Sequence, residues 1–311
     1  MINSTTVFIL GAGASEPYGL PTASKLKSHI CDAVSVDANL VDVEEKTGTP
    51  PQALKSMVDD LKGSGLHSVD LWLEKRKGDY GEIGKVCIAR EIIGREDSQK
   101  LPDGWYSDLW NSYLIPPGGE GPSMIADNKV SFITFNYDRS LEQALMMMVT
   151  KTYRINESEV AEILNKIPII HVYGQVGRLP WQPKTISPIE RSYSNTWDWR
   201  EAKEAATGIK ILHESDSETL EFQRAHEFLA KAERIYFLGF GYHGENMRRL
   251  QSPKSDQKIK QSYHIAGSAL GLPWRERNPL EQGHNPLGVQ IRLGIPKGNV
   301  NHFIQSLVPR I

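Results

Sequence analysis

The chain has 311 residues, with 36 lysines and arginines against 38 aspartates and glutamates. This length suits one large or two ordinary domains, and the balanced charge excludes the global basic field that non-specific nucleic-acid binding needs. Only Cys31 and Cys87 occur, far apart, which excludes a disulfide framework and a zinc site built from cysteines. The start lacks a signal-peptide pattern, and no apolar run approaches the roughly 20 residues of a membrane helix. We therefore expect a soluble, cytoplasmic protein with no membrane contact and no direct nucleic-acid binding.

The most informative stretch near the start is an apolar run that ends in a glycine-rich turn. Val7–Leu10 is typical of a buried parallel strand, and Gly11-Ala12-Gly13-Ala14-Ser15 follows at once. Glycines directly after a strand let the backbone turn tightly and approach a phosphate, so nucleotide binding is the first hypothesis. The motif alone is weak, because Glu16 stands where a dinucleotide fingerprint has its third glycine.

Helical spacing dominates the next part of the chain. Thr22 can cap a helix whose apolar positions Leu26 and Ile30 recur four residues apart. From 37 to 125 the apolar residues fit helical stripes and no β-rich run occurs, so we expect a helical insertion there. Residues 1–311 then form a single domain that contains this insertion.

Later apolar runs, rich in β-branched and aromatic residues, predict the other strands. The three clearest are Val130–Phe135, Ile167–Val172 and Ile235–Leu238, and shorter candidates are Ile209–Leu212, Tyr263–Ala266 and Val289–Leu293. Strands that alternate with helices indicate an α/β fold with a doubly wound, Rossmann-like, mostly parallel sheet.

Polar or glycine-rich stretches stand at the ends of four of these strands. They are Gly11–Ser15, Asn136 with Asp138, His171, and Gly239-Phe240-Gly241 with Tyr242. Because ligands bind beyond the carboxyl ends of parallel strands, these four loops can converge on one crevice. Asn136 and Asp138 suit ribose hydroxyls, a carboxamide or a water, and His171 is a candidate general base.

Each candidate also has a purely structural interpretation. Ser15 can be a turn residue, Asp138 can cap the following helix, and His171 can be a satisfied core histidine. The phosphate loop, the Gly-x-Ser-x-Gly elbow and the His-Glu-x-x-His helix are absent from the sequence. Other conspicuous residues are expected to be surface, capping or packing residues: Asp70, Trp181, Trp197, Trp199, Arg248 and Arg249.

Taken in order, these motifs resemble the NAD-binding core of the sirtuins. The turn Gly11–Ser15 precedes Gly19-Leu20-Pro21, Asn136-x-Asp138 follows a second strand, and a histidine stands near a glycine after a third. Three motifs are most similar to those of the sirtuin-like domains of bacterial anti-phage defence proteins: Phe135-Asn136-Tyr137-Asp138, Ile170-His171-Val172-Tyr173-Gly174, and Leu238-Gly239-Phe240-Gly241-Tyr242 with Asn246. The resemblance spans about residues 5 to 270.

The resemblance implies an activity and a role for each matching residue. Defence proteins of this kind cleave NAD+ to nicotinamide and ADP-ribose, which causes abortive infection, so NAD+ is expected as substrate, without a metal. The catalytic residues are then Asn136 and His171, and the residues that hold NAD+ are Gly11, Ala12, Gly13, Ser15, Asp138, Gly239 and Gly241. In deacylating sirtuins the histidine directly precedes the glycine, a position that Tyr173 holds here, so the register of the histidine stays open.

Two other functions remain alternatives. One is a regulatory module that binds NAD+ or ADP-ribose without turnover. The other is an acyl-lysine deacylase, which the missing zinc cysteines oppose, as does Thr22-Ala23-Ser24 in place of the Asp-Phe-Arg of that family.

The resemblance also implies partners. Defence proteins of this type often carry a sensor domain, and the roughly 40 residues after Leu270 are too few to form one. We therefore expect a trigger in trans, from a HerA-type ATPase or a short Argonaute-like protein, and a homo-oligomer.

Overall fold

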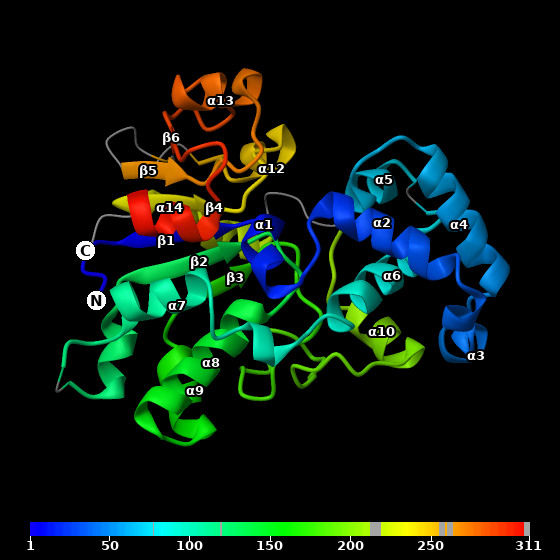
Figure 1. Ribbon diagram of the computed structural model, residues 1–311, viewed down its shortest axis with the longest axis horizontal. Helices are drawn as coiled ribbons and strands as arrows, with labels where there is room; N and C mark the ends of the chain where they lie inside the picture. The colour runs from blue at the N-terminus through cyan, green and yellow to red at the C-terminus, as the bar shows by residue number, and fades with distance from the viewer. Residues whose placement is uncertain (77, 119, 212–218, 255–258, 260–263, 308–311) are drawn as a thin grey trace.

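Figure 1 shows the computed structural model, which describes residues 1–311 except 77, 119, 212–218, 255–258, 260–263 and 308–311. Its six strands form one sheet in which every pairing is parallel, in the order β3-β2-β1-β4-β5-β6. They are β1 (Thr6–Leu10), β2 (Val130–Thr134), β3 (Ile169–His171), β4 (Arg234–Leu238), β5 (His264–Gly267) and β6 (Arg292–Leu293). The predicted α/β class with a Rossmann-like parallel sheet is confirmed.

The sheet separates two hydrophobic cores. Successive strand residues point to opposite faces, so Val7 and Ile9 join one core while Phe8 and Leu10 join the other. Every residue of β1 is buried, which is why its sequence is an unbroken apolar run. The first face packs against α11 (Leu220–Lys231) and α12 (Gly244–Arg249), and the second against α7 (Trp105–Leu109), α8 (Ser140–Tyr153), α9 (Glu157–Leu164) and α14 (Val300–Leu307).

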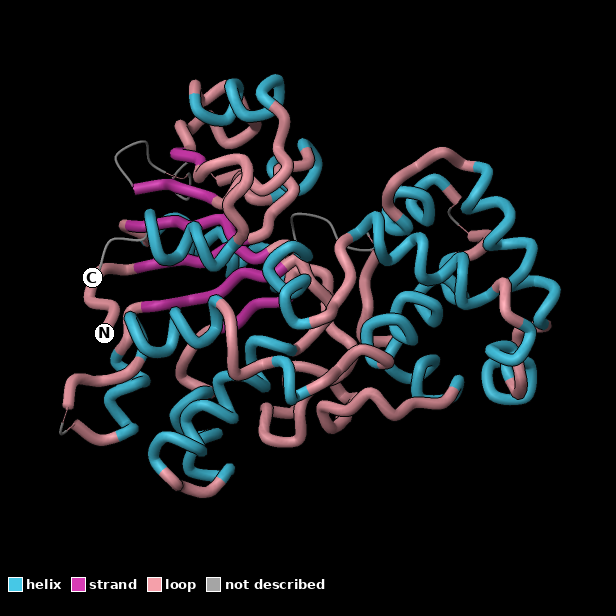
Figure 2. Tube along the Cα trace, viewed as in Figure 1, coloured by secondary structure: helices cyan, strands magenta, loops and turns pink. Residues whose placement is uncertain are grey.

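A helical lobe lies beyond the carboxyl ends of the strands, on the right in Figures 1 and 2. It consists of α2 (Ala23–Val34), α3 (Val43–Thr47), α4 (Pro51–Gly63), α5 (Val69–Lys75), α6 (Gly81–Ile93) and α10 (Trp199–Ala206). No described residue from 37 to 125 belongs to a strand, as the helical stripes predict. The lobe is not one contiguous segment, however, because α10 packs on α6 from a distant part of the sequence and the residues from Trp105 onward return to the sheet.

The remaining elements are short. α1 (Ala12–Ser15) follows β1 directly, and α13 (Trp274–Glu281) packs beside β6 at the edge of the sheet. Single 3-10 turns occupy Glu16–Tyr18, Asp37–Leu40, Ser98–Lys100 and Pro122–Asp127, and a π-helical turn occupies Trp110–Leu114. No helix among the described residues is long and apolar enough to cross a membrane.

Three local expectations need correction. Ile209 forms only an isolated bridge with Gly174 rather than a strand, and Leu212 lies outside the described residues. The last strand is confined to Arg292–Leu293, and Tyr263, expected in the strand before it, also lies outside the described residues. Thr22 occupies the N-cap position of α2, but its side chain makes no capping hydrogen bond.

Candidate functional site

The glycine turn after β1 lies where the order of the sheet reverses. β1 pairs with β2 on one side and with β4 on the other, so the chain moves outward in both directions from this strand. In open α/β sheets this reversal creates a crevice beyond the carboxyl ends of the strands, where ligands bind. Gly11–Ser15 therefore occupies the position that a nucleotide-binding turn takes in such folds.

The two Gly-x-Gly turns contact each other. Gly13 N–H donates to Gly239 O at 3.0 Å. A Cβ on Gly239 would lie 1.9 Å from the backbone nitrogen of Ala14, and Gly239 also has a φ of +57°, a conformation that favours glycine. A Cβ on Gly11 would lie 2.6 Å from Gly239 O. Glycine is thus required at these positions for the two turns to approach each other. The Gly13 N–H donates to Gly239 O, so it is not free to bind a ligand.

Asn136 joins the glycine turn to the end of β2. Its side-chain amide donates to Gly11 O at 3.1 Å and to Ser15 Oγ at 3.0 Å. Its backbone N–H donates to Thr134 Oγ1 at 3.1 Å, which fixes the turn that follows the strand. Residues that follow two separate strands, more than a hundred positions apart, are therefore bonded directly at the reversal point.

His171, at the end of β3, is held through both ring nitrogens. Nδ1 donates to Asn136 O at 2.9 Å, and Nε2 lies 2.7 Å from Glu142 Oε1, in the first turn of α8. Burial opposes a charge on the ring, but the Glu142 carboxylate and the two hydrogen bonds outweigh it and raise the pKa of His171 above its usual value. The ring therefore holds a proton more readily than a free imidazole does, and it positions the Asn136 backbone.

Asp138 completes the polar cluster. One of its carboxylate oxygens accepts hydrogen bonds from the Ser140 amide, at 3.1 Å, and from the Ser140 hydroxyl. The Ser140 hydroxyl in turn lies 2.6 Å from the Tyr106 hydroxyl. Burial raises the pKa of Asp138, although the hydrogen bonds from Ser140 and Ser15 favour its charged form.

We call these residues the polar network, defined as Ser15, Asn136, Asp138, Ser140, Glu142 and His171. None of them is more than 8% exposed, so the network is almost wholly covered by protein. The structure thus brings together Ser15, Asn136, Asp138 and His171, all expected from the sequence, and places Gly11, Gly13 and Gly239 beside them. Ala12 lies within the same turn, whereas Gly241 is exposed and lies outside the network.

Sequence reasoning missed Glu142 and misjudged Asp70. Tyr137, between the two polar residues of the motif, donates its hydroxyl to Asp70 Oδ1 at 2.5 Å. Asp70 belongs to α5 of the helical lobe, and burial raises the pKa of its carboxyl. The expected surface or capping residue is therefore a contact between the lobe and the Asn136–Asp138 turn. No local signal identifies it, because the two partners are 67 positions apart.

A buried ion-pair cluster adjoins the network. Arg139, next to Asp138, is fully buried and binds Glu96 through Nε at 2.9 Å and a terminal nitrogen at 2.6 Å. Arg191 binds the same carboxylate at 2.6 Å. Arg139 also donates to Arg191 O at 2.6 Å, so the cluster ties the loop around 191 to the start of α8.

The other residues singled out from the sequence have varied environments. Trp199 is buried and Trp197 packs edge-on against it, as expected of packing residues. Arg248 is exposed, as expected for a solvated helix face, but the Arg249 guanidinium lies 5.7 Å from the centre of the Tyr173 ring and its side chain is only 12% exposed. The expectation of a solvated face is therefore wrong for Arg249.

Cavities open beside the ion-pair cluster and in the helical lobe. One of about 350 Å³ lies against Glu96 and Tyr193, beside the ion-pair cluster, and a larger one lies in the helical lobe. Neither is lined by the residues of the polar network. No group of three histidine, cysteine or acidic side chains among the described residues is arranged to hold a metal ion.

The fold and this site define an α/β protein with a Rossmann-like sheet and a polar network at the reversal point. No protein-family model and no curated protein sequence matches the chain. Its function is therefore inferred from the structure and the sequence motifs.

Proposed function

We propose that the chain is an NAD+ glycohydrolase, which cleaves NAD+ to nicotinamide and ADP-ribose. The observation that carries this proposal is the pair of bonds from Asn136 to Gly11 O and Ser15 Oγ. They put the Asn-x-Asp motif directly against the glycine turn at the reversal point of the sheet, where Rossmann-like folds bind nucleotides. The order of the motifs, which resembles that of the sirtuin-like defence proteins, supports the same substrate.

The chemistry of the reaction fits the residues of the polar network. Cleavage of the bond between nicotinamide and ribose builds positive charge on the sugar, so fixed dipoles and carboxylates near the ribose lower the barrier. In this proposal the Asn136 amide and Asp138 face the nicotinamide ribose, and the glycine turn lies along the pyrophosphate. His171 then acts as a positioning residue, because its ring fixes the Asn136 carbonyl while Glu142 holds the opposite nitrogen.

The burial of the network bears on regulation. Its side chains are covered in the structure, so NAD+ can reach them only when the surrounding loops open. A trigger supplied by another protein suits that requirement. By resemblance, the partner is a HerA-type ATPase or a short Argonaute-like protein, the chain forms a homo-oligomer, and the outcome is abortive infection in anti-phage defence.

The hydrogen bonds of His171 favour a second function. Both of its ring nitrogens are bonded to protein acceptors, so the ring offers no free base to a water molecule in this arrangement. A module that binds NAD+ or ADP-ribose and transmits its occupancy without turnover needs no such base.

Nicotinamide release and calorimetric binding of NAD+ distinguish the two functions. The chain is assayed alone and with a co-expressed candidate partner, and Asn136→Ala is compared with Asn165→Ala, an exposed asparagine at the end of α9. Release that falls at least a hundredfold in Asn136→Ala and persists in Asn165→Ala supports the glycohydrolase, on the scale of one lost transition-state hydrogen bond. Binding without release under all conditions supports the module, and a wild-type chain that does not bind NAD+ contradicts both.

A further inference from the structure

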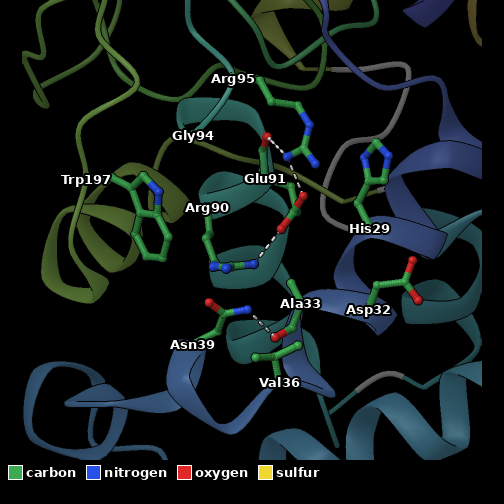
Figure 3. A pocket seen from close by; sticks show the side chains of 10 residues that line it. All are labelled: His29, Asp32, Ala33, Val36, Asn39, Arg90, Glu91, Gly94, Arg95 and Trp197. Carbon is green, nitrogen blue, oxygen red and sulfur yellow. Dashed lines mark hydrogen bonds and ion pairs between the residues drawn. The ribbon is translucent and has the colours of Figure 1, made fainter.

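The helical lobe contains a cavity of its own, far in sequence from the polar network. It measures about 570 Å³, within the range of small-molecule sites. We call it the lobe cavity, lined by His29 and Ala33 of α2, by Arg90 and Glu91 of α6, and by Arg95 and Trp197 (Figure 3). Val36, which is 51% exposed, and the exposed Asp32 also line it. The cavity is therefore open to solvent.

Basic groups converge on one carboxylate inside the lobe cavity. Arg90 binds Glu91 Oε1 at 2.5 Å, and Arg95 binds the other carboxylate oxygen and also donates to Glu91 O at 2.9 Å. Glu91 is 3% exposed, whereas Asp32 faces solvent. Two guanidinium groups thus meet one buried carboxylate in the interior of the cavity, and the second carboxylate, that of Asp32, lies at its exposed rim.

Two polar atoms in the lobe cavity have no partner. His29 Nδ1 and Arg90 Nε are both shielded from the surface and make no hydrogen bond. Figure 3 shows the His29 ring beside the Arg95 guanidinium, on the side away from Trp197. Arg95 contributes to lowering the pKa of His29, after burial, so the ring is a neutral donor or acceptor next to a cation. Unpaired buried polar atoms are costly, so a ligand toward which these side chains turn would be stabilised by supplying the missing bonds.

The opposite side of the lobe cavity offers a flat surface. The Arg90 guanidinium lies 4.7 Å from the centre of the Trp197 ring and 5.5 Å from that of Trp199. A guanidinium plane that rests on indole rings can also receive a planar heterocycle, as arginines do in nucleotide recognition. Val36 adds an apolar contact at the rim.

We propose that the lobe cavity binds a small organic anion that carries a planar ring, the chemistry of a nucleoside monophosphate. Its anionic group lies between Arg95 and His29, and its ring lies toward Arg90 and Val36. This site is separate from the polar network and does not depend on the proposed NAD+ cleavage. The two sites are nevertheless connected. Glu96 follows Arg95 of the lobe cavity and forms an ion pair with Arg139, the residue after Asp138 of the network.

Calorimetry of the full chain with adenosine 5′-monophosphate, adenosine and inorganic phosphate tests the site. Three variants alter it differently: Arg95→Gln removes a cation, His29→Ala removes a side chain whose Nδ1 has no partner, and Ala33→Leu fills the space. Arg95→Gln is expected to weaken monophosphate binding about ten- to a hundredfold, the range for a lost hydrogen bond to a charged group. His29→Ala weakens it less, and Ala33→Leu abolishes it.

Two controls separate this site from others. Arg76→Gln changes an exposed arginine of the same lobe and should bind the monophosphate as the wild type does, whereas Asn136→Ala alters the polar network and reports any monophosphate that binds there instead. His29→Ala and Ala33→Leu remove no existing partner bond, so they keep the test valid if Arg95→Gln fails to fold. The proposal is overturned if the wild-type chain binds no monophosphate at millimolar concentration or if Ala33→Leu binds it normally. It is also overturned if only Asn136→Ala loses binding, or if adenosine binds as tightly as the monophosphate.

Discussion

Replacement of His171 by alanine tests whether the His171–Glu142 pair holds the polar network together. The change removes the cation beside a carboxylate that is 1% exposed, and it leaves the Asn136 carbonyl without its donor. Loss of one member of a buried ion pair typically costs about 3–5 kcal/mol, because the other charge stays buried and unpaired. Since domains of ordinary stability have only about 5–15 kcal/mol in total, we expect a marked loss of stability.

The double variant His171→Ala/Glu142→Gln isolates the charge. If the stranded carboxylate causes most of the loss, neutral glutamine should restore part of the stability, and the double variant should be at least as stable as His171→Ala. Urea unfolding followed by tryptophan fluorescence measures all three proteins, with Asn165→Ala as a surface control. A cost below about 1 kcal/mol for His171→Ala would refute the pair as a buried structural element, since that is the range of exposed pairs.

The pH dependence of the same pair has a definite sign. The pKa of His171 is raised in the folded protein, so its stabilisation is fully present below the unfolded value of about 6.5 and is lost as the pH rises through the folded pKa. Glu142→Gln should therefore be less stable than the wild type at pH 6, and the gap should narrow toward pH 9. Contributions of the other histidines cancel in this difference, and a gap that widens with pH would contradict the assignment.

Two further substitutions test contacts around the site. Gly239→Ala should destabilise the fold by several kcal/mol and lower Tm, because the new Cβ would lie 1.9 Å from the Ala14 nitrogen in a left-handed conformation; a variant with wild-type Tm would contradict the contact between the two turns. Tyr137→Phe should lower the free energy of unfolding in urea by about 1.5–3 kcal/mol, because it removes a donor to the Asp70 carboxylate. When Tyr137→Phe is introduced into the Asp70→Asn variant, the loss should be smaller. Equal costs in both backgrounds would show that the two side chains are not coupled.

The sequence predicted those features that depend on local pattern. Strand β1 is buried on both faces and is therefore an uninterrupted apolar run, and glycines mark the turns where backbones approach closely. Asn136 and His171 were found because they end apolar strands, and parallel strands bring such ends to one edge of the sheet. Helical periodicity likewise identified the absence of strands among the described residues from 37 to 125.

The partners of these residues were decided only by the tertiary structure. Glu142 stands in an ordinary helical pattern, and only the packing of α8 against β3 puts its carboxylate 2.7 Å from His171 and turns a candidate base into one half of an ion pair. The sequence predicts a surface or capping role for Asp70, whereas the structure places it beside Tyr137, which donates a hydrogen bond to it. The sequence by itself thus determined the α/β class and which residues stand at the strand ends. Hydrogen bonds and charges act over a few ångströms in space, so which groups those residues face, and how each is charged, depended on contacts between distant segments.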